Sequence, residues 1–246
     1  MMYTITPLMM GWKEYELSEA IYRRHFGVLQ KNCFVAYLLR SGSECILVDS
    51  GPPRHEEAIK RPIFPTLNDY VRLDDALAKE GVKPEQISKV ILSHLHWDHC
   101  WNLDLFPQAK IYVQKKEINY AVAPVEGSQD VRMYGALPEC GTPGWFEGWS
   151  QMVRVDGDVE IMPGINVILT PGHSPGSQCV LVDTKEGKYL LPGDFIPKFE
   201  NFRDGVPNGI IGNMYDWFAS YHRIKNLTPN CLPAHDMGIL DRKVYG

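Results

Sequence analysis

Residues 90–99 constrain this chain more than any other part of its sequence. An apolar run passes there directly into Ser-His-Leu-His-Trp-Asp-His. An extended backbone places alternate side chains on one side, so His94, His96 and Asp98 converge, and His99 reaches them from the next turn. Imidazole and carboxylate are ligands that Zn, Mn, Fe and Co share. A hydrogen-bonded core histidine is the alternative for any one residue, but four ligating side chains in six positions predict a metal site.

Three later apolar segments also end in a ligating side chain. In each of them a glycine or proline lets the chain turn sharply, so the next side chain points off the sheet edge. With the first cluster they supply five histidines and two aspartates, a set that suits two metal ions. The added ligands are His173, Asp194 and His235, at the ends of segments 168–173, 190–194 and 231–235.

The order of these motifs resembles that of the metallo-β-lactamase superfamily: H-x-H-x-D-H, then T-P-G-H, G-D and a last histidine. The resemblance covers roughly Phe34 to Asp236 and implies an α/β fold, a four-layer αββα sandwich with the metals at one edge of the two sheets. It also implies that Asp49, in a turn similar to the family's D-T-G, supports the ligands from behind; a purely structural turn aspartate is the alternative. The resemblance assigns His94, His96 and His173 to one metal, Asp98, His99 and His235 to the other, and Asp194 to both.

Such a site predicts hydrolysis. Two divalent cations contribute +4, whereas Asp98, Asp194 and a bridging hydroxide contribute −3, which leaves about +1 to attract a carbonyl or phosphoryl oxygen. The metals lower the pKa of bound water from about 15.7 to about 7, so the bridging hydroxide attacks at neutral pH. One metal stabilises the oxyanion, and the other metal or Asp98 assists the departing group. We expect Asp98 and Asp194 to be catalytic and two divalent ions per chain, zinc first, with Mn, Fe or Co open.

Short strands dominate the chain, and helical segments lie between groups of them. We expect one domain over residues 1–246, with an N-terminal excursion over residues 1–33. Residues 121–150 are rich in Gly, Pro and Trp and carry no periodic pattern, which is typical of a lid or a dimer contact. We expect helices over 66–79, capped by Thr66, and 214–227, and strands over 34–39, 45–49, 89–93, 110–114, 151–155, 159–162, 165–170, 178–183, 188–191 and 231–234.

Composition excludes several other classes. The 25 basic and 30 acidic side chains give a net charge of −5, and no basic block is present, which argues against a nucleic-acid or anionic-membrane binder. Prolines interrupt the apolar stretch 159–182, and no basic region precedes an apolar one at the start, so we expect no membrane span and a cytoplasmic chain. The six cysteines form no C-x-x-C pair, which favours reduced, packed thiols.

Within the superfamily, four branches fit less well. The β-lactamases with a cysteine ligand at the position of Asp194, and the diiron flavoproteins with a glutamate at that of His96, differ in their ligands. Glyoxalase II enzymes need a C-terminal helical region, for which the 11 residues after His235 leave no room, and nucleases need a basic surface and a further domain. The N-acyl homoserine lactonase-like group is more similar, because Thr170–Ser177 follows its T-P-G-H-S-P-G-H segment.

Two positions depart from that group. Trp101 and Asn102 replace its Gly-Gly pair after the first ligand cluster, which alters the turn or the pocket wall. Pro197 stands where those lactonases have a tyrosine that helps to polarise the lactone. Either the metals act alone or another donor replaces this tyrosine, and the candidates are Tyr215, Tyr221 and His222.

Aromatic residues predict an apolar pocket over the metals, suited to an uncharged lactone or ester. The candidate substrate contacts are Trp97, Phe195, Trp12 and Phe64, with core packing as the alternative for each. The leading hypothesis is a hydrolase that opens a lactone or related cyclic ester, as a small-molecule enzyme and a possible homodimer. The alternatives are a thioester or phosphodiester hydrolase on the same metals, a mononuclear iron enzyme of sulfur or oxygen chemistry, and a non-catalytic binding protein that kept the fold.

Overall fold

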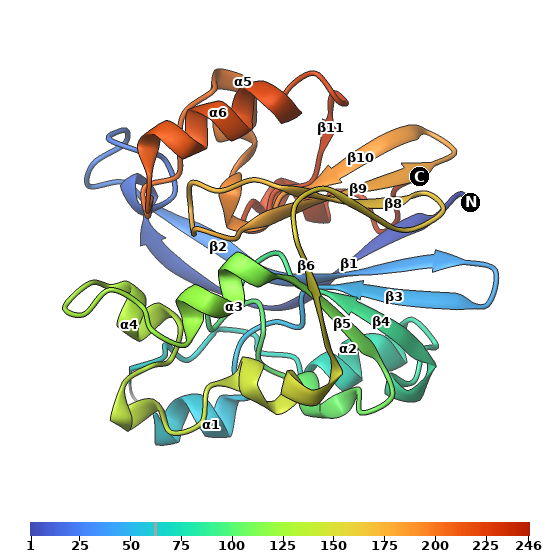
Figure 1. Ribbon diagram of the computed structural model, residues 1–246, viewed down its shortest axis with the longest axis horizontal. Helices are drawn as coiled ribbons and strands as arrows, with labels where there is room; N and C mark the ends of the chain where they lie inside the picture. Colours follow the sequence, from blue (N-terminus) through green and yellow to red (C-terminus); the bar gives the residue numbers. More distant parts are fainter. Residues whose placement is uncertain (62) are drawn as a thin grey trace.

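Two β-sheets lie face to face with helices on both outer sides (Figure 1). The computed structural model describes residues 1–61 and 63–246. One sheet has the strand order β1-β2-β3-β4-β5-β6, and the other has β11-β10-β9-β8-β7. Helices α1 and α2 lie outside the first sheet, and α5 and α6 outside the second, so the expected αββα sandwich is confirmed.

The first sheet changes from antiparallel to parallel pairing at β3. Strands β1, β2 and β3 pair antiparallel, whereas β3, β4, β5 and β6 are parallel neighbours. The carboxyl ends of these parallel strands therefore meet at one edge, where chemistry can be assembled from consecutive loops. The strands are β1 (Thr4–Glu16), β2 (Leu29–Ser41), β3 (Glu44–Val48), β4 (Ile87–Ile91), β5 (Lys110–Gln114) and β6 (Met152–Val155).

The second sheet brings three more strand ends to the same region. Strands β8 and β10 both pair antiparallel with β9, and β11 is parallel to β10, so β8, β10 and β11 run in one direction. Between the sheets, alternate apolar side chains of both inner faces form one core, as in Val35, Tyr37, Val180 and Val182. The strands are β7 (Val159–Met162), β8 (Ile165–Leu169), β9 (Gln178–Thr184), β10 (Gly187–Leu191) and β11 (Asn230–Cys231).

The helices cover the outer faces with their apolar sides. In α6, for example, Trp217 and Ile224 are buried against the second sheet. The α-helices are α1 (His55–Lys60), α2 (Leu73–Lys79), α3 (Lys115–Ala121), α4 (Asp130–Met133), α5 (Phe199–Asp204) and α6 (Met214–Ile224). The short 3₁₀ helices are η1 (Leu17–Glu19), η2 (Pro84–Gln86), η3 (Leu103–Leu105), η4 (Pro138–Cys140), η5 (Gly144–Gln151), η6 (Gly193–Phe195) and η7 (Met237–Leu240).

The helix expected from Thr66 begins later, at Leu73. The backbone of Asn68 exchanges two hydrogen bonds with that of Trp12 in β1, with N···O distances of 3.0 and 2.9 Å. This pairing holds the preceding residues extended, so Thr66 caps no helix. Tertiary pairing overrides local helix propensity here.

The N-terminal excursion is an integral part of the first sheet. Strand β1 pairs with β2 from Thr4 opposite Arg40 to Glu16 opposite Leu29, with one irregularity near Gly11. Residues 121–150 are also folded, because they form α4, η4 and η5 and bury Tyr134, Cys140 and Trp145. Their function as a lid or a dimer contact stays a prediction.

Membrane-spanning helices and paired cysteines are both absent from the described part of the chain. Across residues 1–61 and 63–246, no helix has the length and apolar character that crossing a bilayer requires. All six cysteines are buried and unpaired in the structure, and their reduced state stays a prediction.

Candidate metal centre

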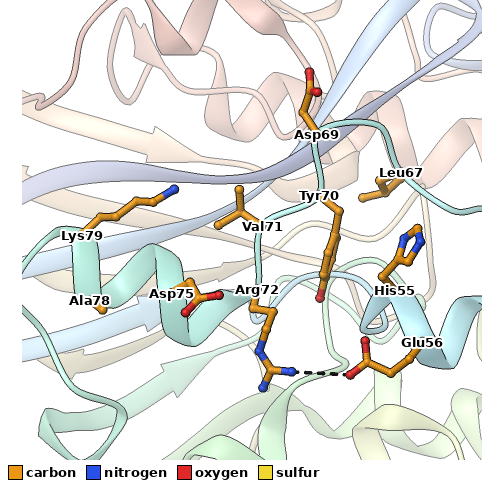
Figure 2. A pocket seen from close by; sticks show the side chains of 10 residues that line it. All are labelled: His55, Glu56, Leu67, Asp69, Tyr70, Val71, Arg72, Asp75, Ala78 and Lys79. Atoms are coloured by element: carbon orange, nitrogen blue, oxygen red, sulfur yellow. Dashed lines mark hydrogen bonds and ion pairs between the residues drawn. The ribbon is translucent and has the colours of Figure 1, made fainter.

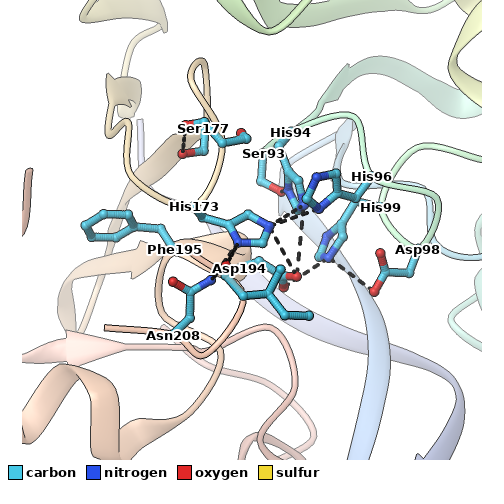
Figure 3. A network of polar contacts seen from close by, with 12 residues as sticks. Ser93, His94, His96, Asp98, His99, His173, Ser177, Asp194, Phe195 and Asn208 are labelled. Atoms are coloured by element: carbon cyan, nitrogen blue, oxygen red, sulfur yellow. Dashed lines mark hydrogen bonds and ion pairs between the residues drawn. The ribbon is translucent and has the colours of Figure 1, made fainter. Parts of the chain in front are cut away.

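All seven side chains predicted as metal ligands meet at the sheet edge where β4, β8, β10 and β11 end. Figure 3 labels all of them except His235. Within each of two groups, one potential ligand atom per residue lies within 4.8 Å of the others. Asp194 belongs to both. The imidazole group is His94, His96, His173 and Asp194; the carboxylate group is Asp98, His99, His235 and Asp194.

Three imidazole nitrogens converge in the imidazole group. Nε2 of His173 lies 3.2 Å from Nε2 of His94 and 3.0 Å from Nδ1 of His96. Nδ1 of His173 is 2.7 Å from the Ile210 carbonyl oxygen, so Nδ1 carries the proton and Nε2 presents a lone pair. Burial lowers the pKa values of His94 and His96 far below normal, which keeps both rings neutral. Nitrogen lone pairs this close repel one another unless they share a cation, so this donor set fits a metal ion.

The carboxylate group brings charge to the same edge. Oδ1 of Asp194 lies 2.8 Å from Nε2 of His235 and 3.1 Å from Nε2 of His99. Oδ2 of Asp98 lies 3.5 Å and 3.7 Å from the same two nitrogens. Among the described residues, Oδ1 of Asp98 and Oδ1 of Asp194 are buried without a hydrogen-bond donor. Unpaired buried carboxylate oxygens are costly, and a divalent cation would satisfy them.

The pKa values of the carboxylate group also indicate a site for a cation. Burial lowers the pKa of His99, but the carboxylates of Asp194, Asp98 and Asp49 outweigh burial and raise it well above normal. Burial raises the pKa of Asp194, but the adjacent His235 and His99 outweigh burial and hold it well below normal. The protein therefore stabilises positive charge at this position, which is the property that a cation site needs.

Asp49 holds one of these histidines in place. It follows β3 with a left-handed φ of 62°, uncommon for a residue other than glycine. Its Oδ1 accepts a hydrogen bond from the Ser93 backbone at 2.7 Å, and its Oδ2 lies 2.7 Å from Nδ1 of His99. Because Nδ1 is occupied, Nε2 of His99 faces the carboxylate group. Asp49 therefore contacts one candidate ligand from behind, and its support of a bound metal stays a prediction.

Close backbone packing aims two further ligands. A Cβ on Gly172, at φ +146°, would lie 2.6 Å from Cα of Trp217, and a Cβ on Gly193 would lie 2.5 Å from Cβ of Ser93. Glycine lets each turn approach its neighbour, so His173 and Asp194 reach the site. Trp217 lies beneath both turns, because its Nε1 also donates to the Phe195 carbonyl oxygen at 3.0 Å.

Two of the four candidate substrate contacts belong to one aromatic cluster next to the candidate metal ligands. Trp97 and Phe64 pack ring to ring with centroids 5.7 Å apart. Phe34 lies 5.8 Å from Trp97 and 5.2 Å from the ring of His235. These aromatic rings form an apolar wall next to the carboxylate group.

The other two candidates lie elsewhere. Phe195 is 0% exposed and stacks on Trp217 at 5.2 Å, away from the imidazoles (Figure 3), so it has no surface to offer a substrate. Trp12 donates to Oδ2 of Asp69 at 2.6 Å and lies under the Lys31 ammonium, at 3.9 Å from the ring centroid. The structure therefore places Trp12 in a polar contact on β1.

The three proposed replacements for the missing tyrosine all belong to α6, outside the second sheet. Tyr215 is 89% exposed, Tyr221 donates to the Phe202 carbonyl oxygen at 2.9 Å, and His222 is exposed. Tyr15 on β1 is better placed, since it packs 6.4 Å from the ring of Phe34. Burial and the nearby Asp98 carboxylate raise the pKa of Tyr15. Sequence reasoning missed it, because nothing in β1 distinguishes it from other strand tyrosines.

A separate open groove of about 1040 Å³ lies between α1, α2 and the segment before α2 (Figure 2). None of the seven candidate ligands lines it, and its walls carry both charges. It is lined by His55, Glu56, Leu67, Asp69, Tyr70, Val71, Arg72, Asp75, Ala78 and Lys79.

An αββα sandwich with two adjoining His/Asp groups at one sheet edge defines a class of metal-dependent hydrolases. The family description "Metallo-beta-lactamase superfamily" matches residues 29–234, and the chain belongs to this superfamily. The resemblance stated from the motifs is therefore confirmed.

Relatives and solved structures point in the same direction. An N-acyl homoserine lactonase of Bacillus cereus is 35% identical over 181 residues, which cover 70% of this chain and 67% of the relative. A solved Bacillus thuringiensis AiiA variant with N-decanoyl-L-homoserine at its active site matches with a TM-score of 0.79 and 26% identity, over 98% of this chain and 96% of that one. An N-acyl homoserine lactone hydrolase with N-hexanoyl-L-homoserine at its catalytic metal centre matches with the same score, identity and coverage. The expectation of a metal-dependent hydrolase is confirmed.

Proposed function

We propose that this chain uses two divalent metal ions, zinc in the first instance, to open a lactone or a related cyclic ester. The observation that carries the proposal is the pair of adjoining ligand groups that share Asp194. Similarity to enzymes that open N-acyl homoserine lactones supports a lactone as the substrate class.

Each group would hold one ion, and Asp194 would bridge the two. When bound, the ions would supply an activated water and an electrophile for the substrate carbonyl oxygen. His94, His96 and His173 would hold the first ion, and Asp98, His99 and His235 the second. The remaining steps depend on side chains around these groups.

Asp98 is suited to carry the proton that ring opening requires. Its Oδ1 is buried and receives no hydrogen bond from the described residues. Burial raises the pKa of the Asp98 carboxyl group, and a cation bound to the same group would lower it. When the ester bond breaks, the leaving oxygen stays attached to the opened product and needs one proton. Asp98 would bind the ion through one oxygen, and its other oxygen would take the proton that the attacking water gives up and pass it to the leaving oxygen.

The wall beside Asp98 favours an uncharged substrate. Trp97, Phe64 and Phe34 offer apolar surface next to the carboxylate group. Such a wall suits a ring or an acyl chain better than the negatively charged phosphate of a phosphodiester. Tyr15 packs against Phe34, and its hydroxyl would donate to the substrate in place of the tyrosine absent at Pro197.

Turnover on a panel of substrates tests this function. Zinc- or manganese-loaded protein is assayed with acyl homoserine, aliphatic and ring-fused aromatic lactones, beside a thioester and a phosphodiester, with a pH indicator as readout. Turnover of a lactone that disappears with a chelator and returns with metal supports the proposal. If no lactone is turned over and the thioester or the phosphodiester is, the proposed lactone substrate is wrong.

The segment 121–150 supports a further proposal on assembly. Val122, Val125 and Phe146 are exposed there, and apolar surface of this kind is a common dimer contact. A homodimer through this segment would dissociate when Phe146 is changed to serine, and sedimentation analysis measures that change.

A further inference from the structure

Glu117, in the first turn of α3, connects the two turns that supply the imidazole group. Its side chain is completely buried. Its Oε1 accepts hydrogen bonds from the Leu95 backbone N–H at 3.0 Å and from the Tyr134 hydroxyl at 2.8 Å. Leu95 is the residue between His94 and His96. This half of the carboxylate therefore holds the first ligand turn.

The other carboxylate oxygen holds the second ligand turn. Oε2 accepts hydrogen bonds from the Ser174 hydroxyl at 2.8 Å and from the Gly176 backbone N–H at 3.0 Å. Ser174 directly follows His173. A Cβ on Gly176 would lie 2.2 Å from the backbone nitrogen of Glu117, so only glycine lets the turn pack this closely against the helix.

The four donors leave Glu117 no part in the chemistry itself. Both oxygens are occupied, two donors each, so neither is free to bind an ion or take a substrate proton. A buried carboxylate is costly unless it is hydrogen-bonded throughout, and such networks fix a unique geometry. Tyr134 adds a further contact, because its ring meets that of His96 edge to face at 4.7 Å.

The carboxylate group has different supports. Nδ1 of His99 is held by Asp49 at 2.7 Å, and Nδ1 of His235 lies 2.7 Å from the Cys33 carbonyl oxygen. Glu117 makes no hydrogen bond to these supports. Asp49 also reaches the imidazole group, because its Oδ2 accepts a hydrogen bond from the Ser93 hydroxyl at 2.9 Å, and this hydroxyl lies 3.0 Å from Nδ1 of His94. Glu117, in contrast, contacts the imidazole side alone.

We propose that Glu117 is a positioning residue that sets the distance between the His94–His96 turn and His173, and thereby the affinity of the imidazole group for its metal ion. The inference rests on the proposed metal function but not on the substrate. It predicts that loss of the Glu117 carboxylate weakens one metal position and spares the other.

The test is a metal titration of Glu117→Gln. Glutamine keeps the volume and one acceptor oxygen. Its NH₂ group cannot accept a hydrogen bond from the two donors that it faces, so one of the two turns loses its hydrogen bonds to residue 117. Metal-free wild type and variant are titrated with cobalt(II), and the visible absorption bands and competition with a chelator give two dissociation constants. We expect one constant to rise about 10- to 100-fold and the other to stay unchanged.

Matched variants make the result decisive. Glu126→Gln is the same chemical change on an exposed residue and should leave both constants unchanged. Asp49→Asn should weaken the other position most, through His99, and the imidazole group to a smaller extent, through Ser93 and His94. If circular dichroism shows that Glu117→Gln does not fold, the same titration is made on Ser174→Ala and Tyr134→Phe. Each of these variants removes one hydrogen-bond donor to Glu117. Unchanged constants, or equal weakening of both, would overturn the proposal. A wild type that binds two ions but opens no lactone would count against the proposed substrate alone.

Discussion

The imidazole group and the carboxylate group lie side by side, share Asp194 and yet differ in charge and in support. The imidazole group has three imidazole rings beside the shared carboxylate, whereas the carboxylate group has Asp98 in place of one ring. An ion among neutral rings keeps more of its positive charge and is the stronger electrophile, whereas an ion beside two carboxylates is more fully compensated. The comparison teaches that the two metal positions are chemically unequal even though one aspartate joins them.

Asp194→Ala should have the largest effect, because it removes the one ligand common to both groups. We expect fewer than two ions per chain and a loss of turnover greater than about 100-fold, since indirect supports alone are worth 10- to 100-fold. Metal analysis by plasma emission and a lactone assay measure both quantities. A variant that keeps two ions and full activity would disprove the bridging assignment.

Removal of both ions should come next in size. Bound metal stabilises the fold by about 2.7 kcal/mol at a free concentration 100 times Kd, and the converging rings of His94 and His173 repel one another without it. Calorimetry of chelator-treated protein should show a lower melting temperature that recovers on readdition of zinc. An identical melting temperature with and without metal would contradict this expectation.

A matched pair, His173→Ala and His235→Ala, separates the two groups. Each removes one ring from one group only. We expect each variant to lose one ion, or to bind it about 100-fold more weakly, with the other ion retained. Loss of both ions from either variant would mean that the two positions fill only together.

Tyr15→Phe examines the substrate side of the carboxylate group. The ring and its packing on Phe34 are kept, and only the hydroxyl is lost. If the hydroxyl donates to the developing oxyanion, kcat falls about 10- to 100-fold with a small change in KM. A change in KM alone would indicate that Tyr15 contributes to binding and not to the transition state.

Glu186→Gln is the smallest expected effect and provides a control outside both metal groups. Its hydrogen bond from Arg242 lowers the pKa of Glu186 from 4.5 to about 2. A lowered pKa in the folded state means stability that is present above pH 4.5 and lost as the pH falls toward 2. The melting temperature of the variant should therefore lie slightly below wild type at pH 7 and approach it near pH 2, since exposed ion pairs contribute little. A difference that grows toward low pH would contradict this.

The sequence could predict that the seven candidate ligands meet, because each lies in the segment that follows an apolar strand. Parallel strand ends meet at one edge, so a strand-end pattern carries three-dimensional information. The same reasoning failed for Phe195, one residue past a ligand. The turn η6 directs Asp194 to the edge and the next side chain into the core against Trp217, so adjacency in sequence is not proximity to the site.

Glu117 could not be predicted for a related reason. In the sequence it is an ordinary acidic residue in a helix's first turn, where such residues are common. Its four partners come from three separate segments, and only the folded chain brings them together. Helix α2 likewise starts at Leu73 because Asn68 pairs with β1, a contact 56 residues apart in sequence that no local pattern contains.

Trp217 gives the outer helix α6 a part in the site that its distance from the ligands conceals. Its backbone fits against Gly172, and its indole group binds the carbonyl oxygen next to Asp194. A redesign that exchanges the outer helices of this protein, on the assumption that they only cover the sheets, would therefore also displace the two turns that carry the candidate ligands His173 and Asp194.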